Sequence, residues 1–417
     1  MAPCLPYALW LVVGSVGPGA HEVRTHRAVR KGEEVRRPVY SEMAGLTSAQ
    51  RSDLLALSRA IHADPELAYQ ERRAAAAIAA LAERAGYTVE RGVGGLETAF
   101  RVRAGPAGPA IALLAEYDAL PDVGHGCGHN LIAISNVGAF LVAAASTPRL
   151  EVGVELIGTP AEESGGGKID LLDAGVFDHA VAALSSHPAA GGGWGVSGTG
   201  LGVVGKRVTF TGVAAHAGSS PEKGRNALNA VIRLFVGVDG WRQQLESDSR
   251  VHGIITDGGK AMNVVPARAE AIFGLRAKDV STLDGMVDRF ADITEGAALL
   301  TGTKAEIAEY LRYYAPVRAN ARLGDVVAEE LARHGVTPER GALVTASTDL
   351  GNVSQRVPTD WIRFPVTEEP IAGHSDAMRE ASIGELAHRN AFITAEALGA
   401  AAVRVATDRA LREALAR

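Results

Sequence analysis

The chain has 417 residues, of which 47% are hydrophobic and 22% are charged, and its formal net charge is -6. This composition is typical of a globular protein with enough material for about two domains of 100–200 residues. The slight negative charge and the lack of a long Lys/Arg block argue against a nucleic-acid partner and against a membrane surface. Two cysteines, Cys4 and Cys127, provide no disulfide framework, which favours a reducing cytoplasm.

The first 43 residues differ from the rest of the chain. A short apolar run at residues 5–16 is followed by a charged stretch without periodicity. The run is shorter than the roughly 20 residues that span a bilayer, and it lacks the basic start and the small-residue cleavage site of a secretory signal. We therefore expect residues 1–43 to be a disordered extension, with Met43 as an alternative start and secretion left open.

Helical and strand patterns alternate over residues 44–204. Leucine spacing predicts a helix from Ser48 to the residue before Pro65, and an Ala-rich helix follows at 71–84. Strands are predicted at residues 88–89, 98–102, 110–115 and 152–158, with a buried helix at 130–145. The strand at 110–115 is apolar throughout, as expected of a strand covered on both faces. The alternation predicts an α/β fold with a mostly parallel sheet and ligands at the carboxyl ends of its strands.

The pattern changes after the glycine-rich residues 191–205. Strand, helix, two strands, helix and strand are predicted at 206–213, 226–245, 253–257, 269–277, 281–299 and 304–313. This order is that of a ferredoxin-like α+β domain. The earlier alternation resumes from Pro316. We therefore predict a catalytic domain in two parts, 44–204 and 315–417, and an inserted lid or dimerisation domain at 205–314.

A cysteine and two histidines lie among glycines at residues 124–130, directly after the strand at 110–115 and the acidic Glu116-Tyr117-Asp118. Glycines allow a sharp turn that presents thiol and imidazole ligands, so the stretch predicts a metal site. Cys127 and His129 can share one face of an extended segment. His125 is interpreted as a turn residue or as support behind the ligands.

Four further stretches place ligand-type side chains beside small residues at the ends of predicted elements. They contain Glu162-Glu163 before three glycines, His187, His216 and His374. Adjacent carboxylates on extended backbone point in opposite directions, so one glutamate is expected to bind metal while the other moves a proton.

Five candidate ligands result, namely Cys127, His129, Glu163, His187 and His374. Five is one more than a structural zinc takes, and a thiolate bridging two metals would use them well.

These motifs, in this order, resemble the aminoacylase/carboxypeptidase-type family of dinuclear metallo-amidohydrolases. The likeness spans about residues 47–400 and is greatest to the aminobenzoyl-glutamate and indoleacetyl-amino-acid hydrolase branches. The matching stretches are Glu116-Tyr117-Asp118-Ala119-Leu120-Pro121, Cys127-Gly128-His129-Asn130, Pro160-Ala161-Glu162-Glu163, His187-Pro188, His216, Asn263 and His374-Ser375.

The resemblance implies a role for each of these residues. Cys127 matches the bridging thiolate, and the other four candidate ligands match the remaining metal ligands. Glu162 matches the general base that activates water. His216 matches a lid histidine that steadies the oxyanion, often in the partner subunit's site.

The resemblance also implies residues that contact the substrate or support the ligands. Asn263 matches a lid residue that contacts the substrate, and Arg276 is a candidate clamp for a substrate carboxylate. Asp118 and Asp349 are expected to contact the metal ligands and orient them, without binding the metal themselves. Asn130 stands where many relatives carry a metal-bridging Asp, so Cys127 must provide the bridge if two metals bind.

The sequence therefore predicts a metal-dependent hydrolase of amide or peptide bonds in small N-acyl amino acids or unusual dipeptides. It implies two divalent ions per subunit, zinc before manganese or cobalt, a cytoplasmic homodimer or larger homo-oligomer, and no nucleic acid or membrane partner.

Two alternatives are a non-catalytic metal-binding protein with this fold and a cysteine amidase that uses Cys127 with His129. The amidase is disfavoured because neither a helix start nor a separate base is evident beside the thiol. His388 and the remaining histidines outside the motifs are expected on the surface.

Overall fold

The computed structural model describes residues 45–416, so the extension predicted at 1–43 lies outside the described residues. Helix α1 (Ser48–Ala63) begins where the leucine pattern predicts, and the Thr47 side chain caps it in a reciprocal pair with Gln50. Helix α2 (Arg72–Arg84) ends two residues before Gly86, whose φ of 91° is the left-handed conformation common at helix ends.

The larger sheet has eight strands in the order β1-β2-β4-β3-β5-β14-β6-β12. Its strands are β1 (Val89–Arg91), β2 (Phe100–Ala104), β3 (Ala110–Ala115), β4 (Gly153–Gly158), β5 (Ala180–Ala189), β6 (Gly195–Val196), β12 (Glu339–Arg340) and β14 (Thr359–Pro365). The central strands β4, β3, β5 and β14 are parallel, while β2 is antiparallel to both β1 and β4 and β6 is antiparallel to β14. The predicted mostly parallel sheet is confirmed.

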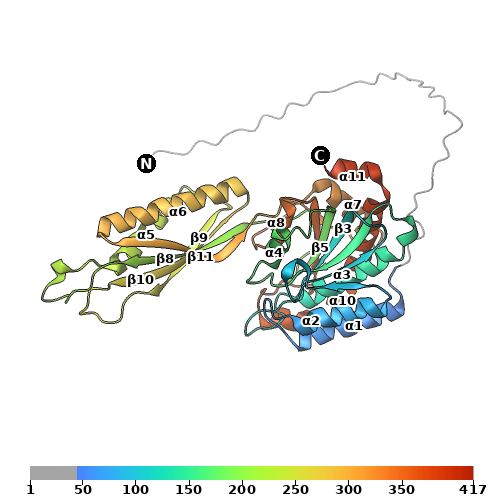
Figure 1. Cartoon of the computed structure of the whole chain (residues 1–417), viewed down its shortest axis with the longest axis horizontal. Coiled ribbons are helices and arrows are strands. Elements are labelled where there is room, and N and C mark those ends of the chain that lie inside the picture. Colours follow the sequence, from blue (N-terminus) through green and yellow to red (C-terminus); the bar gives the residue numbers. More distant parts are fainter. Residues whose placement is uncertain (1–44, 417) are drawn as a thin grey trace, which may run out of the picture. The chain divides into compact units, whose positions relative to one another are not determined.

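Helices cover both faces of this sheet. Ile111 and Leu113 of β3 face a core shared with α3 (His129–Ala144), α7 (Ala321–Ala332) and α10 (Glu385–Thr407). Ala112 and Leu114 face the other side, toward α4 (Gly167–Asp173) and α8 (Leu350–Ser354) (Figure 1). Every residue of α3 is buried, because the helix packs against the sheet and also against α1 and α10. The predicted buried helix is therefore confirmed.

The second sheet has four antiparallel strands in the order β11-β8-β10-β9. Its elements are β8 (Gly202–Thr211), α5 (Ala227–Arg242), β9 (Arg250–Asp257), β10 (Arg268–Ala277), α6 (Val280–Thr301) and β11 (Lys304–Tyr314). Both helices lie on one face of this sheet and share a separate apolar core with it (Figure 1). The ferredoxin-like order is confirmed, although β8 begins four residues earlier than the sequence predicts.

The remaining elements are short. They are β7 (Thr199–Gly200) paired with β13 (Leu343–Val344), the 3-10 turns η2 (Val93–Gly95), η3 (Thr147–Arg149) and η4 (Pro221–Lys223), and the helices α9 (Asp376–Ala381) and α11 (Arg409–Leu415). Between residues 45 and 416 we find no helix of sufficient length and hydropathy to span a bilayer.

Candidate active site

The predicted ligands gather where the parallel strands end. Glu116 and Asp118 follow β3, the Glu162-Glu163 pair follows β4, and His187 lies near the end of β5. Carboxyl ends of parallel strands share one edge of a sheet, which is the usual ligand-binding edge of such folds. A cavity of about 630 Å³ opens there, and Cys127, Glu162, Glu163, His187 and His374 all line it.

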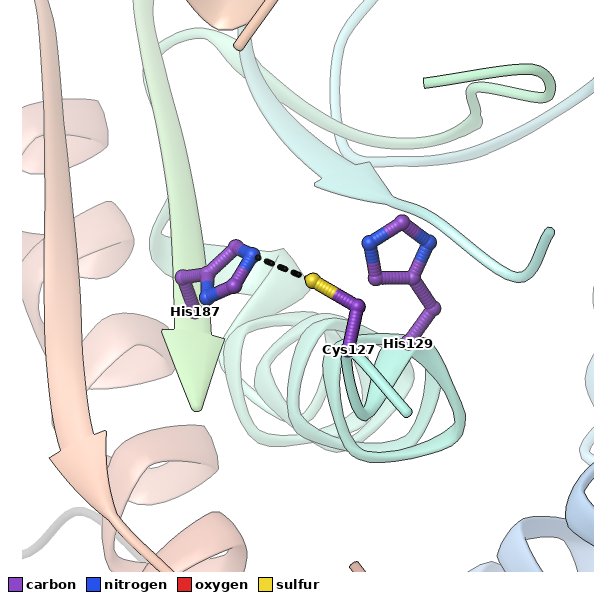
Figure 2. Close-up of side chains that lie close together, drawn as sticks. All are labelled: Cys127, His129 and His187. Atoms are coloured by element: carbon purple, nitrogen blue, oxygen red, sulfur yellow. Dashed lines mark hydrogen bonds between the residues drawn. The ribbon is translucent and has the colours of Figure 1, made fainter. Parts of the chain in front are cut away.

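Cys127 and His129 reach the site from a turn at the start of α3. Gly128 is left-handed, with φ 80°, and His129 is the first helical residue, so the expected extended segment is wrong. A Cβ atom on Gly128 would lie 2.7 Å from Pro188 Cγ, which explains the glycine. The turn nevertheless directs the thiol toward β5, where Sγ of Cys127 lies 3.5 Å from Nε2 of His187 (Figure 2).

His187 presents an imidazole suited to binding a cation. Its Nδ1–H donates to the carbonyl of Pro188 at 2.8 Å, which leaves the lone pair of Nε2 facing Cys127. Burial lowers the pKa of His187 to about 4, so the ring is neutral at physiological pH. A neutral histidine fixed by a hydrogen bond from its other nitrogen is the usual form of a metal ligand.

His129 is held from behind by Asp118. Its Nδ1–H donates to Asp118 Oδ1 at 2.9 Å, while Asp118 Oδ2 accepts the backbone N–H of Glu163 at 2.9 Å. Burial by itself lowers the pKa of His129, but the carboxylate of Asp118 outweighs it and holds that pKa well above its usual value. Nε2 faces the carboxylates of Glu116, Glu162 and Glu163 at 3.7, 3.9 and 3.5 Å.

The two adjacent glutamates come from a turn rather than from extended backbone. Ala161 has φ 60°, in the left-handed region, so the expected extended backbone is wrong, and both Glu162 and Glu163 line the cavity. Burial first, and then neighbouring carboxylates, raise the pKa of Glu162 well above its usual value. Burial also raises the pKa of Glu163. His374 approaches from the other side, with Nε2 3.8 Å from Glu163 Oε2.

Unpaired ligand atoms converge in this cluster. Glu116 Oε2, His129 Nε2 and Glu163 Oε1 are buried and have no hydrogen-bond partner among the described residues. Such atoms are costly to bury, and bound cations would satisfy them.

The possible ligand atoms form three groups, each spanning no more than 4.8 Å: Cys127 with His129 and His187, Cys127 with Glu163 and His374, and Glu116 with His129 and Glu162. Cys127 belongs to two of the groups, so the thiolate lies where it could serve two ions. The mixed sulfur, nitrogen and oxygen donors fit divalent transition metals.

Two residues of the cluster were missed from the sequence, Glu116 and Lys168. The buried ammonium of Lys168 lies 2.8 Å from Glu116 Oε1 and 2.6 Å from Asp349 Oδ1. Asp349 therefore reaches the ligand cluster through Lys168. Glu116 could have been found, because it lies two residues before Asp118 and so on the same side of an extended segment. No pattern marks Lys168.

The residues expected from the four-stranded sheet divide into two groups. Arg276 of β10 lines the cavity and donates through Nη1 to Ser347 Oγ at 2.7 Å. His216 and Asn263 are exposed and do not line it. Their loops pair with each other instead, through a bridge between His216 and Val264 and a 2.9 Å hydrogen bond from Ala217 N–H to Asn263 O.

Among the histidines outside the ligand set, His252 and His334 are exposed as expected, whereas His388 is not. His388 is buried, not on the surface, and its Nε2 lies 3.0 Å from Ser58 Oγ of α1. His125 is buried beside His62, with ring centroids 6.1 Å apart.

A helix start does lie beside Cys127, contrary to the argument used against a cysteine amidase. Burial nevertheless raises the pKa of the Cys127 thiol, which disfavours a free thiolate nucleophile.

Comparison with known proteins places this site in a family. The chain is 35% identical to a mouse Xaa-Arg dipeptidase, over 89% of this chain and 91% of that protein. It is 37% identical to one subunit of the p-aminobenzoyl-glutamate hydrolase of Escherichia coli, over 64% of this chain and 60% of that protein.

Among solved structures, a dinuclear metal-binding peptidase of the M20 family from Bacillus subtilis has the same fold. Its TM-score is 0.70 at 21% identity, with 86% of this chain and 99% of that chain covered. The family described as peptidase family M20/M25/M40 matches residues 112–391. The chain therefore belongs to the peptidase family M20/M25/M40.

Proposed function

We propose that this member of a peptidase family hydrolyses the amide bond of small N-acyl amino acids or unusual dipeptides with the help of two divalent metal ions. The observation that carries the proposal is the cluster of possible metal ligands at the strand ends, because Cys127, Glu163, His187 and His374 of this cluster line a cavity large enough for such a substrate. Relatives named as a dipeptidase and as an aminobenzoyl-glutamate hydrolase support an amide substrate.

Cys127, His129, Glu163, His187 and His374 would hold the ions, with Cys127 shared between them. Divalent ions at this position polarise a carbonyl and lower the pKa of water, and the mixed donor set suits zinc before manganese or cobalt. Asp118 accepts the Nδ1–H of His129 and so directs Nε2 toward the other ligands, where a bound cation would take the place of the Nε2 proton.

Glu162 is the proposed general base. It lines the cavity beside the ligand cluster, and its raised pKa suits a carboxylate that accepts a proton from the attacking water and returns it to the leaving amine. Arg276 would bind the free carboxylate of the substrate, because a guanidinium can form two parallel hydrogen bonds to a carboxylate.

We infer that residues 205–314 form a lid domain inserted between catalytic segments 44–204 and 315–417. His216 and Asn263 do not line the cavity of this chain, so we assign them to the site of a second subunit in a homodimer or larger homo-oligomer. There His216 would steady the oxyanion and Asn263 would contact the substrate. The reducing environment that a bridging thiolate needs agrees with a cytoplasmic protein.

The test is a hydrolysis screen of aminobenzoyl-glutamate, N-acyl amino acids, and β-alanyl and lysyl dipeptides, with zinc, manganese or cobalt. Activity should vanish on chelation and return with metal. Glu162→Gln should lower kcat by about 10²–10⁴-fold with metal content unchanged. Cys127→Ser should lower both metal content and rate.

Glu368→Gln is the matched control, because Glu368 is exposed and lies outside the cavity. Activity that survives complete metal removal would refute the proposal and favour the cysteine amidase. Metal binding without hydrolysis of any substrate in the screen would favour a non-catalytic metal-binding protein.

A further inference from the structure

Two arginines from different sheets line the cavity. Arg276 comes from β10 of the four-stranded sheet and Arg363 from β14 of the eight-stranded sheet. Arg363 is in register with His187 across the parallel strands β14 and β5. Register partners point to the same face of a sheet and their strands lie about 4.8 Å apart, so Arg363 stands directly beside a proposed metal ligand.

Neither arginine has a carboxylate partner among residues 45–416. Arg276 donates to the hydroxyl of Ser347 and lies 3.5 Å from His252 Nε2. The guanidinium of Arg363 makes no hydrogen bond or ion pair with any described residue. Other partly buried arginines are paired, for example Arg103 with Glu155 and Arg312 with Asp170.

Burying a guanidinium without an anion is unfavourable, because the charge loses hydration and gains no partner. Two neighbours shape the cavity around Arg363. Its guanidinium lies against the backbone of Gly195, where a Cβ atom would lie 3.2 Å from Nε. Trp361, two residues earlier on the same side of β14, also lines the cavity, and its ring is fixed by a 2.9 Å hydrogen bond from Nε1 to Gly198 O. The arginine and the indole together offer a cationic group next to a rigid apolar wall.

Among the described residues, the cavity has no acidic side chain outside the metal cluster that could pair with a cationic side chain of a substrate. Its acidic lining residues are Glu162 and Glu163, and both belong to the metal cluster. With two divalent ions bound, a lysyl or arginyl side chain would meet a site of net positive charge, which is an effective way to reject it. The relative named Xaa-Arg dipeptidase would therefore differ from this chain in the substrate that its name describes.

We propose that Arg363 binds a second substrate carboxylate, so that the preferred substrates are N-acyl derivatives of acidic amino acids. Arg276 takes the α-carboxylate and Arg363 takes the carboxylate of the side chain. This inference rests on the proposed hydrolase function, and it makes Arg363 a residue that determines specificity.

The test compares N-acetyl-Glu, N-acetyl-Gln and N-acetyl-Lys, which share the acyl group and differ in side-chain charge. For the zinc-loaded wild type, kcat/KM should be at least about tenfold higher for N-acetyl-Glu than for N-acetyl-Gln, and lowest for N-acetyl-Lys. Arg363→Met should lower kcat/KM for N-acetyl-Glu by about 10–100-fold, mainly through KM, because a charge-assisted hydrogen bond is lost. The rate with N-acetyl-Gln should change by less than about threefold.

Arg363→Lys retains the charge but not the planar fork, so its preference for Glu over Gln should be intermediate. Arg389→Met is the matched control, because Arg389 is exposed on α10 and outside the cavity, and it should leave all three rates unchanged. Metal content should be the same in every variant. Calorimetric titration with free glutamate and free glutamine provides a readout that does not depend on turnover, and only glutamate should bind more weakly to Arg363→Met.

Equal losses with N-acetyl-Glu and N-acetyl-Gln would overturn the inference and make Arg363 a structural residue. Efficient hydrolysis of N-acetyl-Lys by the wild type would also overturn it, while leaving the hydrolase function intact. If Arg363→Met does not fold, the wild-type order of the three substrates and the Arg363→Lys variant still decide the question. Failure of the metal-loaded wild type to cleave any amide in the wider screen would refute the proposed function itself.

Discussion

The cluster around Cys127 and the loops that carry His216 and Asn263 differ in their contacts within the chain. The side chains of the cluster contact one another, whereas His216 and Asn263 do not reach the cavity. The cluster lies at the edge of the eight-stranded sheet, where all its members except His374 are buried or half-buried, and its possible ligand atoms form groups that each span no more than 4.8 Å. His216 and Asn263 are exposed on paired loops and lie outside the cavity. Strand ends, one helix start and the loop that carries His374 assemble the first group within one chain, whereas we propose that the second group acts in another subunit.

The two regions also treat charge differently. In the cluster, Lys168 is fully buried between Glu116 and Asp349. Burial alone lowers the pKa of Lys168, but Asp349 and Glu116 outweigh it and hold that pKa above its usual value. In the four-stranded sheet, Lys278 pairs with Glu246 and Asp248 in contact with water. Removing the cation should therefore have very different consequences in the two places.

Lys168→Met should produce the largest loss of stability. The substitution keeps the volume of the side chain but leaves Glu116 and Asp349 buried without a cation. Breaking a buried pair in this way costs about 3–5 kcal/mol of unfolding free energy. Urea unfolding of the metal-free protein measures it. Metal content should fall as well, because Glu116 loses the contact that holds it beside His129.

Lys278→Met is the matched control in the four-stranded sheet. Exposed ion pairs contribute about 0–1 kcal/mol, so this variant should unfold close to the wild type. Similar losses in the two variants would contradict the distinction between a buried and a solvent-exposed charge network. A Lys168→Met protein as stable as the wild type would show that the buried Glu116 and Asp349 do not depend on this cation.

His216→Ala should lower kcat by about 10²–10³-fold, the usual effect of removing one group that stabilises an oxyanion. Metal content should not change, because His216 is outside the ligand cluster. Mixing His216→Ala with Cys127→Ser protein tests where the histidine acts. In a mixed dimer, the intact metal site of the first protein can receive His216 from the second, so activity should return.

Two results would oppose this assignment of His216. Loss of metal in His216→Ala would make the residue a ligand. Failure of the mixture to recover activity, together with a dimer in sedimentation, would place His216 in the site of its own chain. Either result would contradict the proposed difference between the two regions, in which one chain provides all the metal ligands but His216 acts in the site of a second subunit.

Much of the fold follows from the sequence. The apolar run at 110–115 is β3 to the residue, and the strand and helix order of the four-stranded sheet was predicted correctly. These features depend on hydrophobic periodicity over many residues. The turns at Gly128 and Ala161 were not predicted, because a left-handed backbone at one position leaves no periodic pattern.

Single polar residues inside otherwise apolar segments are the hardest to interpret from sequence. Lys168 follows three glycines and Arg363 interrupts an apolar strand, and each resembles an ordinary exposed side chain until its neighbours are known. The candidate ligands were easier to find because several motifs with compatible chemistry recur in order. What the sequence lacks is the identity of the groups that surround each charge.

Substitution of Glu71 should produce the smallest change in the free energy of unfolding. It tests how a buried carboxylate that binds the backbone of Ala161, next to Glu162, affects stability. This carboxylate is fully buried and accepts N–H groups from Tyr69 and Ala161, each at 2.9 Å, and the hydroxyl of Thr98 at 3.0 Å. Burial raises its pKa from 4.5 to about 7 despite these hydrogen bonds. The folded protein therefore binds more protons than the unfolded chain between these pH values, and stability should fall as pH rises through that window.

Glu71→Gln should abolish this slope, because a neutral amide can accept the two N–H groups without carrying charge. At about 1.4 kcal/mol per pKa unit, the variant should be more stable than the wild type above pH 7 by up to roughly 3 kcal/mol. Glu270 in the four-stranded sheet should have the opposite effect on stability, because a hydrogen bond from Thr256 lowers its pKa. Glu270→Gln should slightly destabilise the protein at neutral pH. Urea unfolding from pH 4 to 8 distinguishes the two, and parallel curves for both variants would show that burial does not govern the titration of Glu71.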